Sequence, residues 1–514
     1  MNGGGGAARA ALLAAGAARQ AEGRFEAAVD MFQKAVALDP GDPGGWAALA
    51  RCLFAARRPD LALAACDQAA ARGVEDAGLL CARAEVLQSL SRVDEAAAAF
   101  EAALAREPDR FEARFGLALQ AAERGDWAAA EAHVAPLAAR DAGLPNLAWL
   151  SARIALGRGD QAAARDGLRA LIDNPGLPPV QRADALLMLG EALDGLGDAP
   201  AAFAAAVQGK AIQRALFAER AAGREGEVAK LRRLEAWFAA ADPGPWRTAP
   251  AEEPVADAAA THVFLVGFPR SGTTLLEQAL AGHSGVVALE EAPTLAEAYA
   301  GFMTGPADLA RLGRLTEGEA AAWRARYWAV VRDAGADVAG KTFVDKQPAG
   351  TLYLPLVAKL FPRAKVLFAL RDPRDVALSC LRQAFQMNAM TYAFTDLSET
   401  AACYDACMAL ARRYRALLPL AWRDVRHEAL IAEPAGELTA LAAWLGLAPE
   451  AAMLDVAGTG ERRRVRTPSA PQLREGVTTR HAGRWRAYAR ELAPVMAVLA
   501  PWVEAFGYPP GAAG

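Results

Sequence analysis

The sequence has little of several features that would define a function class at once. Its 514 residues carry a net charge of only −4 and 7% aromatic residues, which does not favour a bulk nucleic-acid binder. The chain has no uninterrupted apolar run of about 18 residues, and its first twenty residues lack the apolar core of a signal peptide. We therefore expect a cytoplasmic protein without a membrane span, in which any anion site is local.

Cysteine is also scarce, and its spacing does not indicate a metal site. Of the six cysteines, only Cys403 and Cys407 are close in sequence, four residues apart on one face of a predicted helix. We favour buried thiols over a ligand pair, because a structural metal needs further ligands at a recognisable spacing. No metal is expected.

The length and the overall composition point to a folded protein with several domains. Hydrophobic residues make up 54% of the chain and charged residues 23%, which excludes a disordered composition. A chain of this length is too long for a single core, so two to four domains are expected.

The sequence does contain a period of 34 residues. The segments GRFEAA, RRPDLA, SRVDEA, GDWAAA and GDQAAA recur at this spacing, and small residues recur with them at two positions. These small residues are Ala28, Ala62, Ala96, Ala130 and Ala164, and earlier in each unit Gly16, Ala50, Ala84, Ala118 and Ala152. The pattern resembles the tetratricopeptide repeat family, whose unit is two closely packed helices. We predict an all-α solenoid of five to six repeats over residues 8–216, the sixth with Gly190, Asp198 and Ala202 after a four-residue insertion.

Such a solenoid presents a concave surface, which predicts a protein or peptide partner. The alternatives are an array that makes a homodimer or that shields the next domain. Residues 217–260 are predicted to be a closing helix, as part of a segment from about Lys210 to Ala241, followed by a linker rich in Pro, Ala and acidic residues.

From residue 261 to 510 short apolar runs alternate with amphipathic segments, which predicts an α/β domain with a parallel sheet. The run HVFLV precedes GFPRSGTT, a phosphate-loop spacing at a strand-to-helix junction, with Thr273 where a triphosphatase has lysine. Backbone N–H groups of such a loop bind anions. The residues expected to do so here are Arg270, Ser271, Gly272, Thr273 and Thr274.

A second cluster follows another predicted strand in the segment VLFALRDPRDVALS. Arg371 ends the strand, Asp372 is the expected N-cap with Pro373 at the first helical position, and Ser379 lies two turns into the helix. We expect Arg371 at the same sheet edge as the loop. The alternative is a surface arginine that caps a helix or pairs with Asp375.

The two motifs together resemble those of sulfotransferases that use 3′-phosphoadenosine 5′-phosphosulfate. FPRSGTTLLE is similar to the family's 5′-phosphosulfate loop, and RDPRDVALS to its 3′-phosphate motif. The chain is most similar to bacterial sulfotransferases with tetratricopeptide repeats, whose catalytic half is related to tyrosylprotein sulfotransferases. The resemblance implies that the loop holds the 5′-phosphosulfate and that Arg371 and Ser379 bind the 3′-phosphate. Such a donor has no β- and γ-phosphates and needs no metal, which accounts for Thr273.

The resemblance also implies catalytic roles. Glu291, in ALEEAPTL, matches the general base, and Glu290 is the alternative; alternation along an extended segment turns only one of them to the site. Lys346, in FVDKQP, matches the lysine that stabilises the transition state, and Lys341 is its competitor. The chain has 49 arginines and only seven lysines, so a lysine here is less expected than an arginine.

A polar loop late in the chain resembles the family's closing segment, which implies Ser469 beside the donor phosphate and Arg484 near the 3′-phosphate. His427 stands where tyrosylprotein enzymes have a nucleotide-contacting tyrosine, and Gln383 stands where an arginine is expected. His283 is interpreted as structural. A peptide tyrosine is one acceptor, and glycan or metabolite hydroxyls are others. The remaining alternatives are a phosphoryl-transfer protein and a non-catalytic repeat scaffold.

Overall fold

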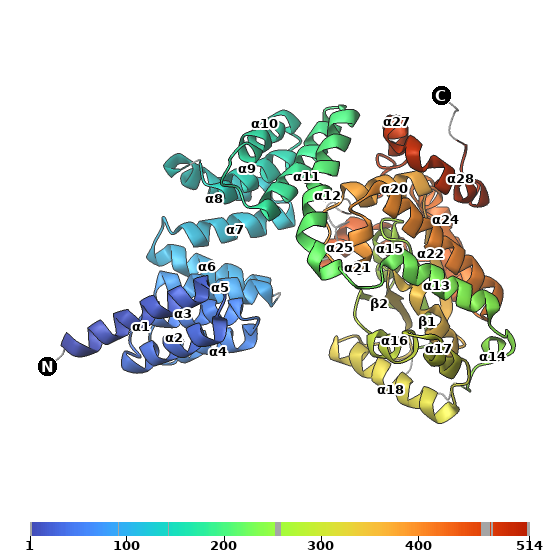
Figure 1. Cartoon of the computed structure of the whole chain (residues 1–514), viewed down its shortest axis with the longest axis horizontal. Helices are drawn as coiled ribbons and strands as arrows, with labels where there is room; N and C mark the ends of the chain where they lie inside the picture. The colour runs from blue at the N-terminus through green and yellow to red at the C-terminus, as the bar shows by residue number, and fades with distance from the viewer. Residues whose placement is uncertain are drawn as a thin grey trace. The chain divides into compact units, whose positions relative to one another are not determined.

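The structure is a computed structural model that describes residues 3–90, 92–141, 143–251, 259–463, 473 and 476–510. These residues form two compact units, which divide between Leu177 and Pro178 (Figure 1). The first unit is helical. Its helices are, in chain order, α1 (Gly3–Ala21), α2 (Phe25–Leu38), α3 (Pro43–Ala55), α4 (Pro59–Ala70), α5 (Ala77–Ser89), α6 (Val93–Arg106), α7 (Phe111–Arg124), α8 (Trp127–Arg140), α9 (Pro145–Gly157) and α10 (Gln161–Ile172).

The recurring small residues lie where the two helices of a repeat pack together. The alanines that follow each turn are fully buried: Ala28, Ala62, Ala96, Ala130 and Ala164 are all 0% exposed. In the other set, a methyl group on Gly16 would come within 2.7 Å of the Phe32 ring, so at this repeat the helices are too close for a side chain unless the ring moves. The predicted repeat packing is therefore present.

In four of the repeats the turn between the two helices passes through a residue in the left-handed conformation. Gly23, Gly125 and Gly159 have φ angles of 74°, 77° and 80°, and Arg57 at the same register has 62°. Glycine adopts this region without steric cost, whereas arginine does so only under the constraint of its surroundings. Asp126, which follows Gly125, then accepts a hydrogen bond from the N–H of Ala129 and caps α8.

The second unit combines a helix pair, a parallel sheet and its covering helices. Its elements are α11 (Pro179–Gly195), α12 (Ala199–Ala221), α13 (Glu227–Ala240), α14 (Gly244–Arg247), β1 (Thr261–Gly267), α15 (Thr273–Ala281), β2 (Val286–Glu290), α16 (Ala296–Phe302), α17 (Pro306–Gly313), α18 (Glu317–Asp333), β3 (Thr342–Lys346), η1 (Gly350–Tyr353), α19 (Leu354–Leu360), β4 (Lys365–Leu370), α20 (Pro373–Arg382), α21 (Ala389–Ala393), α22 (Leu397–Leu417), β5 (Ala421–Arg426), α23 (His427–Ala432), α24 (Pro434–Leu445), η2 (Ala451–Leu454), α25 (Val456–Arg463), η3 (Arg484–Tyr488), α27 (Ala489–Leu492), η4 (Ala493–Val495) and α28 (Met496–Ala505).

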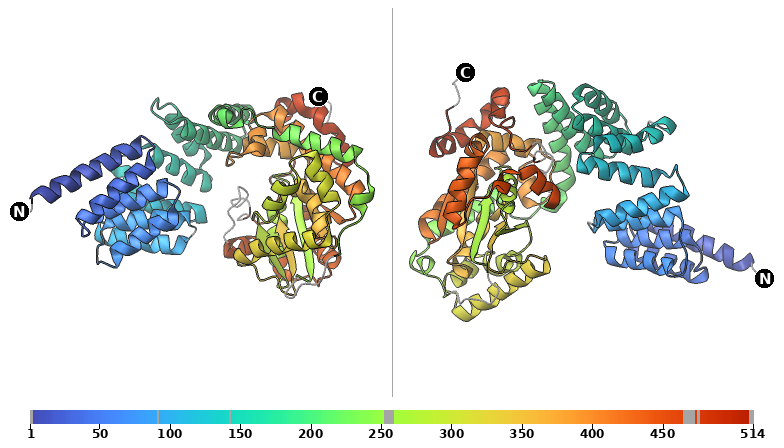
Figure 2. Two further views of the ribbon diagram at one scale, coloured as in Figure 1. Left: turned by 60° about the horizontal axis from the view of Figure 1, so that its bottom comes forward. Right: turned by 180° about the vertical axis from the view of Figure 1, so that it is seen from behind.

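The strands pair in parallel in the order β2-β3-β1-β4-β5, with helices on both faces of the sheet (Figure 2). Along β1, Val263 and Leu265 belong to the apolar core shared with α15 and α24, while Phe264 on the opposite face lies 6.1 Å, centroid to centroid, from Tyr327 of α18. Both faces of the sheet are therefore covered at β1, which is why residues 263–266 of this strand are apolar without alternation. The carboxyl ends of β1, β3 and β4 meet at one edge, where the predicted motifs begin.

The helix pair α11–α12, predicted as the sixth repeat, belongs to the second unit. The Lys210 ammonium of α12 is fully buried and donates to the carbonyl of Gln383, the C-cap of α20, at 2.7 Å. Arg214 of α12 donates to Glu399 of α22 at 3.1 Å. The boundary at residue 216, predicted from the repeat period, therefore lies inside one compact unit.

The segment between the repeats and the sheet matches the prediction in part. The expected closing helix is present as α13, but it does not continue from α12, which ends at Ala221 before Gly223 adopts a φ of 71°. The first part of the expected linker is packed, since Trp246 is 2% exposed and Lys359 donates to the carbonyl of Thr248 at 2.6 Å. Residues 252–258, in the rest of that segment, lie outside the described residues.

Among the helices of the described ranges, none combines the length and the hydrophobicity that crossing a bilayer needs.

Candidate active site

The loop between β1 and α15 turns sharply through two residues in the left-handed conformation, Arg270 with φ of 70° and Gly272 with φ of 93°. A methyl group on Gly267 would lie 2.7 Å from the carbonyl oxygen of Ala369 in β4, so the loop leaves the strand in tight contact with its neighbour. Thr273 then begins α15 and is buried. The loop therefore directs backbone N–H groups at the start of a helix toward one point, which suits an anion.

The predicted cationic residues meet beside this loop. Arg270 Nε donates to Ser379 Oγ at 3.0 Å, and Arg371 Nη1 donates to the carbonyl of Arg270 at 3.2 Å. Both arginines are buried, and burial together with the charge of Arg371 lowers the pKa of Arg270 to about 10. Arg371 Nε has no hydrogen-bond partner among the described residues. Two buried guanidinium groups this close repel each other, and a bound anion would stabilise both.

His427 lies directly behind the loop. A methyl group on Gly272 would approach its Nδ1 to 2.6 Å, so the glycine is required here by both space and backbone conformation. Burial, and then the charges of Arg371, His481 and Arg270, lower the pKa of His427 to about 3. The imidazole is therefore neutral at physiological pH, and it can donate or accept a hydrogen bond but adds no charge.

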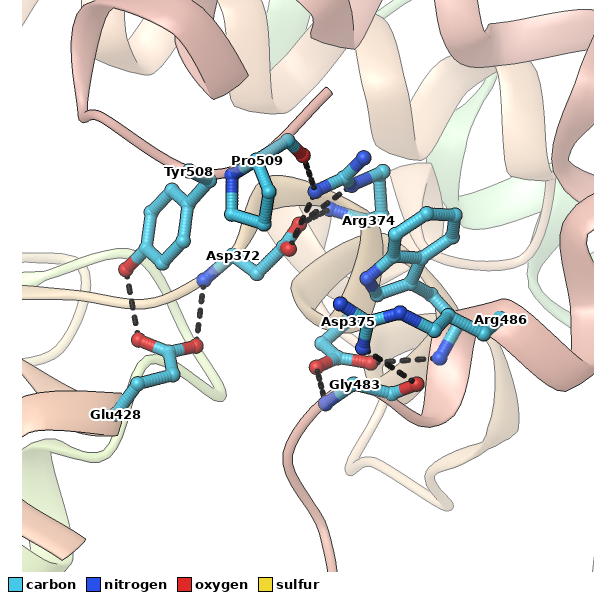
Figure 3. A network of polar contacts seen from close by, with 9 residues as sticks. Asp372, Arg374, Asp375, Glu428, Gly483, Arg486, Tyr508 and Pro509 are labelled. Carbon is cyan, nitrogen blue, oxygen red and sulfur yellow. Dashed lines mark hydrogen bonds and ion pairs between the residues drawn. The ribbon is translucent and has the colours of Figure 1, made fainter. Parts of the chain in front are cut away.

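The start of α20 is fixed by a network that draws on distant parts of the chain (Figure 3). Asp372 is the N-cap, as predicted, and its own N–H donates to Glu428 at 3.0 Å. Asp375 accepts from the N–H of Gly483 at 2.6 Å. Arg371 is 7% exposed, so it is not the surface arginine of the alternative interpretation. Its Nη2 donates to the carbonyl of residue 481 at 2.6 Å.

Lys346 ends β3 opposite Glu290 in the register of the sheet. Its Nζ lies 2.6 Å from Glu291 and 3.2 Å from Glu290. The prediction that only one glutamate faces this point is wrong, because Glu291 has a φ of 51°, which breaks the alternation of an extended segment. The Glu291 side chain is 46% exposed and that of Glu290 24%, so the preferred glutamate is the one with freer access to solvent.

A third carboxylate, Glu277 of α15, was missed by the sequence analysis. It is 0% exposed and lies 3.6 Å from Lys346 Nζ, while its other oxygen accepts from Arg463 at 2.9 Å. Burial opposes the charge of Lys346, but Glu277, Glu291 and Glu290 outweigh it and raise the pKa of the lysine. The signal available in the sequence was a charged residue among the leucines of LLEQAL.

The other predicted residues lie as follows. Arg484 pairs with Asp194 of α11, and Lys341 pairs with Asp337 at 3.2 Å before β3 begins, at the end of the strand opposite Lys346. His283 is structural: its Nε2 lies 2.8 Å from the carbonyl of residue 448 and its Nδ1 accepts from the N–H of residue 285 at 2.9 Å. Ser469 lies outside the described residues.

Cys403 and Cys407 are buried free thiols, and burial raises the pKa of Cys407 to about 12. Within the described part of the chain, no group of three or more His, Cys, Asp or Glu side chains is arranged to bind a metal ion.

Comparison with known families places this site in context. Residues 262–450 match the model of the sulfotransferase family. Residues 19–84 match that of the tetratricopeptide repeat. These matches agree with the predicted order of a repeat region followed by a sulfotransferase domain, and the strand pairing shows that the sheet is parallel. The more specific likeness to tyrosylprotein enzymes stays a prediction.

Individual proteins resemble parts of the chain. An uncharacterized protein of Aquifex aeolicus (strain VF5) is 30% identical over 247 residues, which are 46% of this chain and 32% of that protein. The chain thus spans about a third of the length of the curated relative that it matches. The sulfotransferase domain of the Synechococcus PCC 7002 olefin synthase is 22% identical and covers 50% of this chain and 98% of its own, with a TM-score of 0.35. Pseudomonas aeruginosa pilF is 22% identical, and the match covers 41% of this chain and 93% of pilF, with a TM-score of 0.36.

Proposed function

We propose that the second unit transfers a sulfuryl group from 3′-phosphoadenosine 5′-phosphosulfate to an acceptor hydroxyl. The observation that carries the proposal is the pair of buried arginines, Arg270 and Arg371, beside a phosphate loop that has threonine in place of lysine. Arg270 belongs to the loop after β1 and Arg371 follows β4, so the two cations can serve two anionic groups of one donor. The match to the sulfotransferase family supports this donor.

We assign the 5′-phosphosulfate to the loop residues Arg270 to Thr274 and the 3′-phosphate to Arg371 and Ser379. The unpaired Nε of Arg371 and the Ser379 hydroxyl are the donors available to that phosphate. A neutral His427 behind Gly272 completes the wall of the loop. Arg484 is assigned near the 3′-phosphate from the resemblance alone, and its pairing with Asp194 would have to open for a direct contact.

When bound, the donor supplies the sulfuryl group and leaves with the negative charge on its 5′-phosphate. We assign two side chains of the protein to the transfer. Glu291 takes the proton of the acceptor hydroxyl, and the Lys346 ammonium stabilises the negative charge that develops on the leaving oxygen. In the structure these two side chains pair with each other at 2.6 Å. Catalysis therefore requires that Glu291 turns from Lys346 to the acceptor, for which its exposed position leaves room. Ser469 is proposed beside the donor phosphate.

Calorimetry with 3′-phosphoadenosine 5′-phosphate and with ATP tests the proposal. We expect tight binding of the bisphosphate, no magnesium requirement, and a loss of about 100-fold or more in Arg371→Ala, since a charge-assisted contact to a buried phosphate is lost. Lys341→Ala is the matched control, because its lysine lies at the opposite end of β3. Preference for ATP with magnesium would instead support a phosphoryl-transfer protein.

For the acceptor we propose a peptide tyrosine first, presented by a protein that the repeats bind. Assays of the full chain with tyrosine peptides, glycans and small hydroxyl compounds distinguish the acceptor classes. Nucleotide binding without transfer to any of them would favour a non-catalytic scaffold.

A further inference from the structure

The buried carboxylate of Glu277 faces the same ammonium as the two glutamates of the proposed site. Lys346 and Glu277 are both 0% exposed, whereas Glu290 and Glu291 are partly open to solvent. Three carboxylates therefore surround Lys346, and they differ in how freely their side chains can turn away from it toward solvent. Glu277 is held at a fixed place, one turn into α15 and bonded to Arg463 of α25 at 2.9 Å.

This difference matters because the proposed base is itself a partner of Lys346. When Glu291 turns to the acceptor, the lysine loses its shortest ion pair. An uncompensated ammonium in a buried site is costly and either moves or loses its proton. A carboxylate that stays in place prevents both.

We propose that Glu277 is a positioning residue, the permanent counter-ion that keeps the Lys346 ammonium charged and in place while Glu291 serves the acceptor. The inference rests on the proposed function. Glu277 acts through Lys346, and Arg463 orients the Glu277 carboxylate from the side opposite the lysine. Arg463 is fixed in turn, since its Nη2 donates to the carbonyl of Ala288 in β2 at 2.7 Å.

Few charged groups among the described residues surround Lys346, so the direction in which a substitution changes its pKa and the nucleotide affinity can be predicted. Glu277 faces it from α15, Glu290 from β2 and Glu291 from the turn after β2. Asp345, its neighbour on β3, is engaged elsewhere, by the Tyr327 hydroxyl at 2.8 Å and by Thr294. Removing the Glu277 charge therefore makes the site more positive, which strengthens the binding of an anionic nucleotide but lets Lys346 lose its proton at lower pH.

The experiment compares Glu277→Gln with Glu297→Gln, whose glutamate is an exposed partner of Arg326. Three quantities are measured in the full chain: the calorimetric affinity for 3′-phosphoadenosine 5′-phosphate, kcat, and the pH profile of kcat. For Glu277→Gln we expect nucleotide affinity that is unchanged or up to about tenfold tighter, and an alkaline limb moved down by about one pH unit or more. We expect kcat to fall by about 10- to 100-fold, as for a misplaced catalytic group. Glu297→Gln should match the wild type.

The inference is overturned if kcat of Glu277→Gln equals that of the wild type, or if nucleotide affinity falls together with kcat, which would indicate a structural role. If Glu277→Gln does not fold, Arg463→Gln supplies the opposite change of charge. Nucleotide affinity should then fall and the alkaline limb should not move down; a downward shift would overturn the inference. A wild-type chain that binds no bisphosphate overturns the proposed function and this inference together, whereas normal binding with unaltered variants overturns only the inference.

Discussion

Replacing Asp194 by asparagine tests how strongly the helix pair α11–α12 is joined to the rest of the second unit. The Asp194 carboxylate of α11 lies 2.8 Å from Arg382 at the end of α20, and it also contacts Arg484 and the Tyr488 hydroxyl of η3. One side chain thus joins the repeat-like helices to the helix that carries Ser379 and to the segment beside Arg371. Asparagine keeps the shape and removes the charge.

The expected loss can be worked out from exposure. Asp194 is 16% exposed and Arg382 19%, so this pair is largely shielded and contributes about 2 kcal/mol. The Tyr488 hydrogen bond contributes about 1 kcal/mol. Arg484 is 37% exposed, and solvent screening leaves its ion pair little net value. Because asparagine still accepts a hydrogen bond, the free energy of unfolding of the second unit should fall by about 2–3 kcal/mol.

Urea unfolding of the full chain, followed by the fluorescence of the second unit's tryptophans, measures this loss. Asp337→Asn, at an exposed aspartate, should change stability by less than about 0.5 kcal/mol. Burial raises the pKa of Asp194, but Arg382, Tyr488 and Arg484 outweigh it and lower the pKa overall. The contribution of the carboxylate is therefore present above its unfolded pKa near 3.9 and is lost as the pH falls through the lower folded value. A loss below about 0.5 kcal/mol at pH 7 would refute the reasoning.

Three further changes test the site. Glu291→Gln should lower kcat by about 100-fold or more and retain nucleotide binding, whereas Glu290→Gln should lower it less; the reverse order would exchange their roles. Gly272→Ala should weaken calorimetric nucleotide binding by about 1–3 kcal/mol, because a side chain at φ of 93° is strained and meets His427; unchanged binding would contradict the tight fit. Burial raises the pKa of Asp345 to about 6, so protonation stabilises the fold below about pH 4 and this gain is lost as the pH rises through 6. The stability of Asp345→Asn relative to the wild type, measured in urea, should therefore rise by about 2–3 kcal/mol from pH 4 to pH 8, and a flat difference would count against the buried acid.

The features that could be predicted from the sequence are those carried by neighbouring residues. The 34-residue period places small residues at helix contacts, and Asp372 and Pro373 mark the start of α20 because capping is a local effect. The approach of Arg371 to the loop follows from the rule that parallel strands end at the same edge of a sheet.

The features that were missed depend on contacts between distant segments. Glu277 gains its significance only because Lys346 of β3 lies beside α15. Asp194 gains its significance only because Tyr488, 294 positions later, packs against it. Strand alternation does not extend to Glu291, because a non-glycine residue adopts the left-handed conformation under the constraint of its surroundings, which leaves no mark in the sequence. The burial of Trp246 was missed because it also depends on a distant segment, through Lys359.

The division of the chain at Pro178 bears on how such a protein can change over evolution. Since the contacts of α11–α12 with α20 and α22 all lie within the second unit, a recombination event at residue 178 leaves every one of them intact, whereas an event at residue 217 or 260 severs them. We therefore expect repeats upstream of residue 178 to be exchangeable as modules and the last helix pair to stay with the sheet. If the sheet were joined to a new repeat array without α11–α12, the buried faces of α20 and α22 would be exposed. Arg382, Arg484 and Tyr488 would then lose the Asp194 carboxylate that they share.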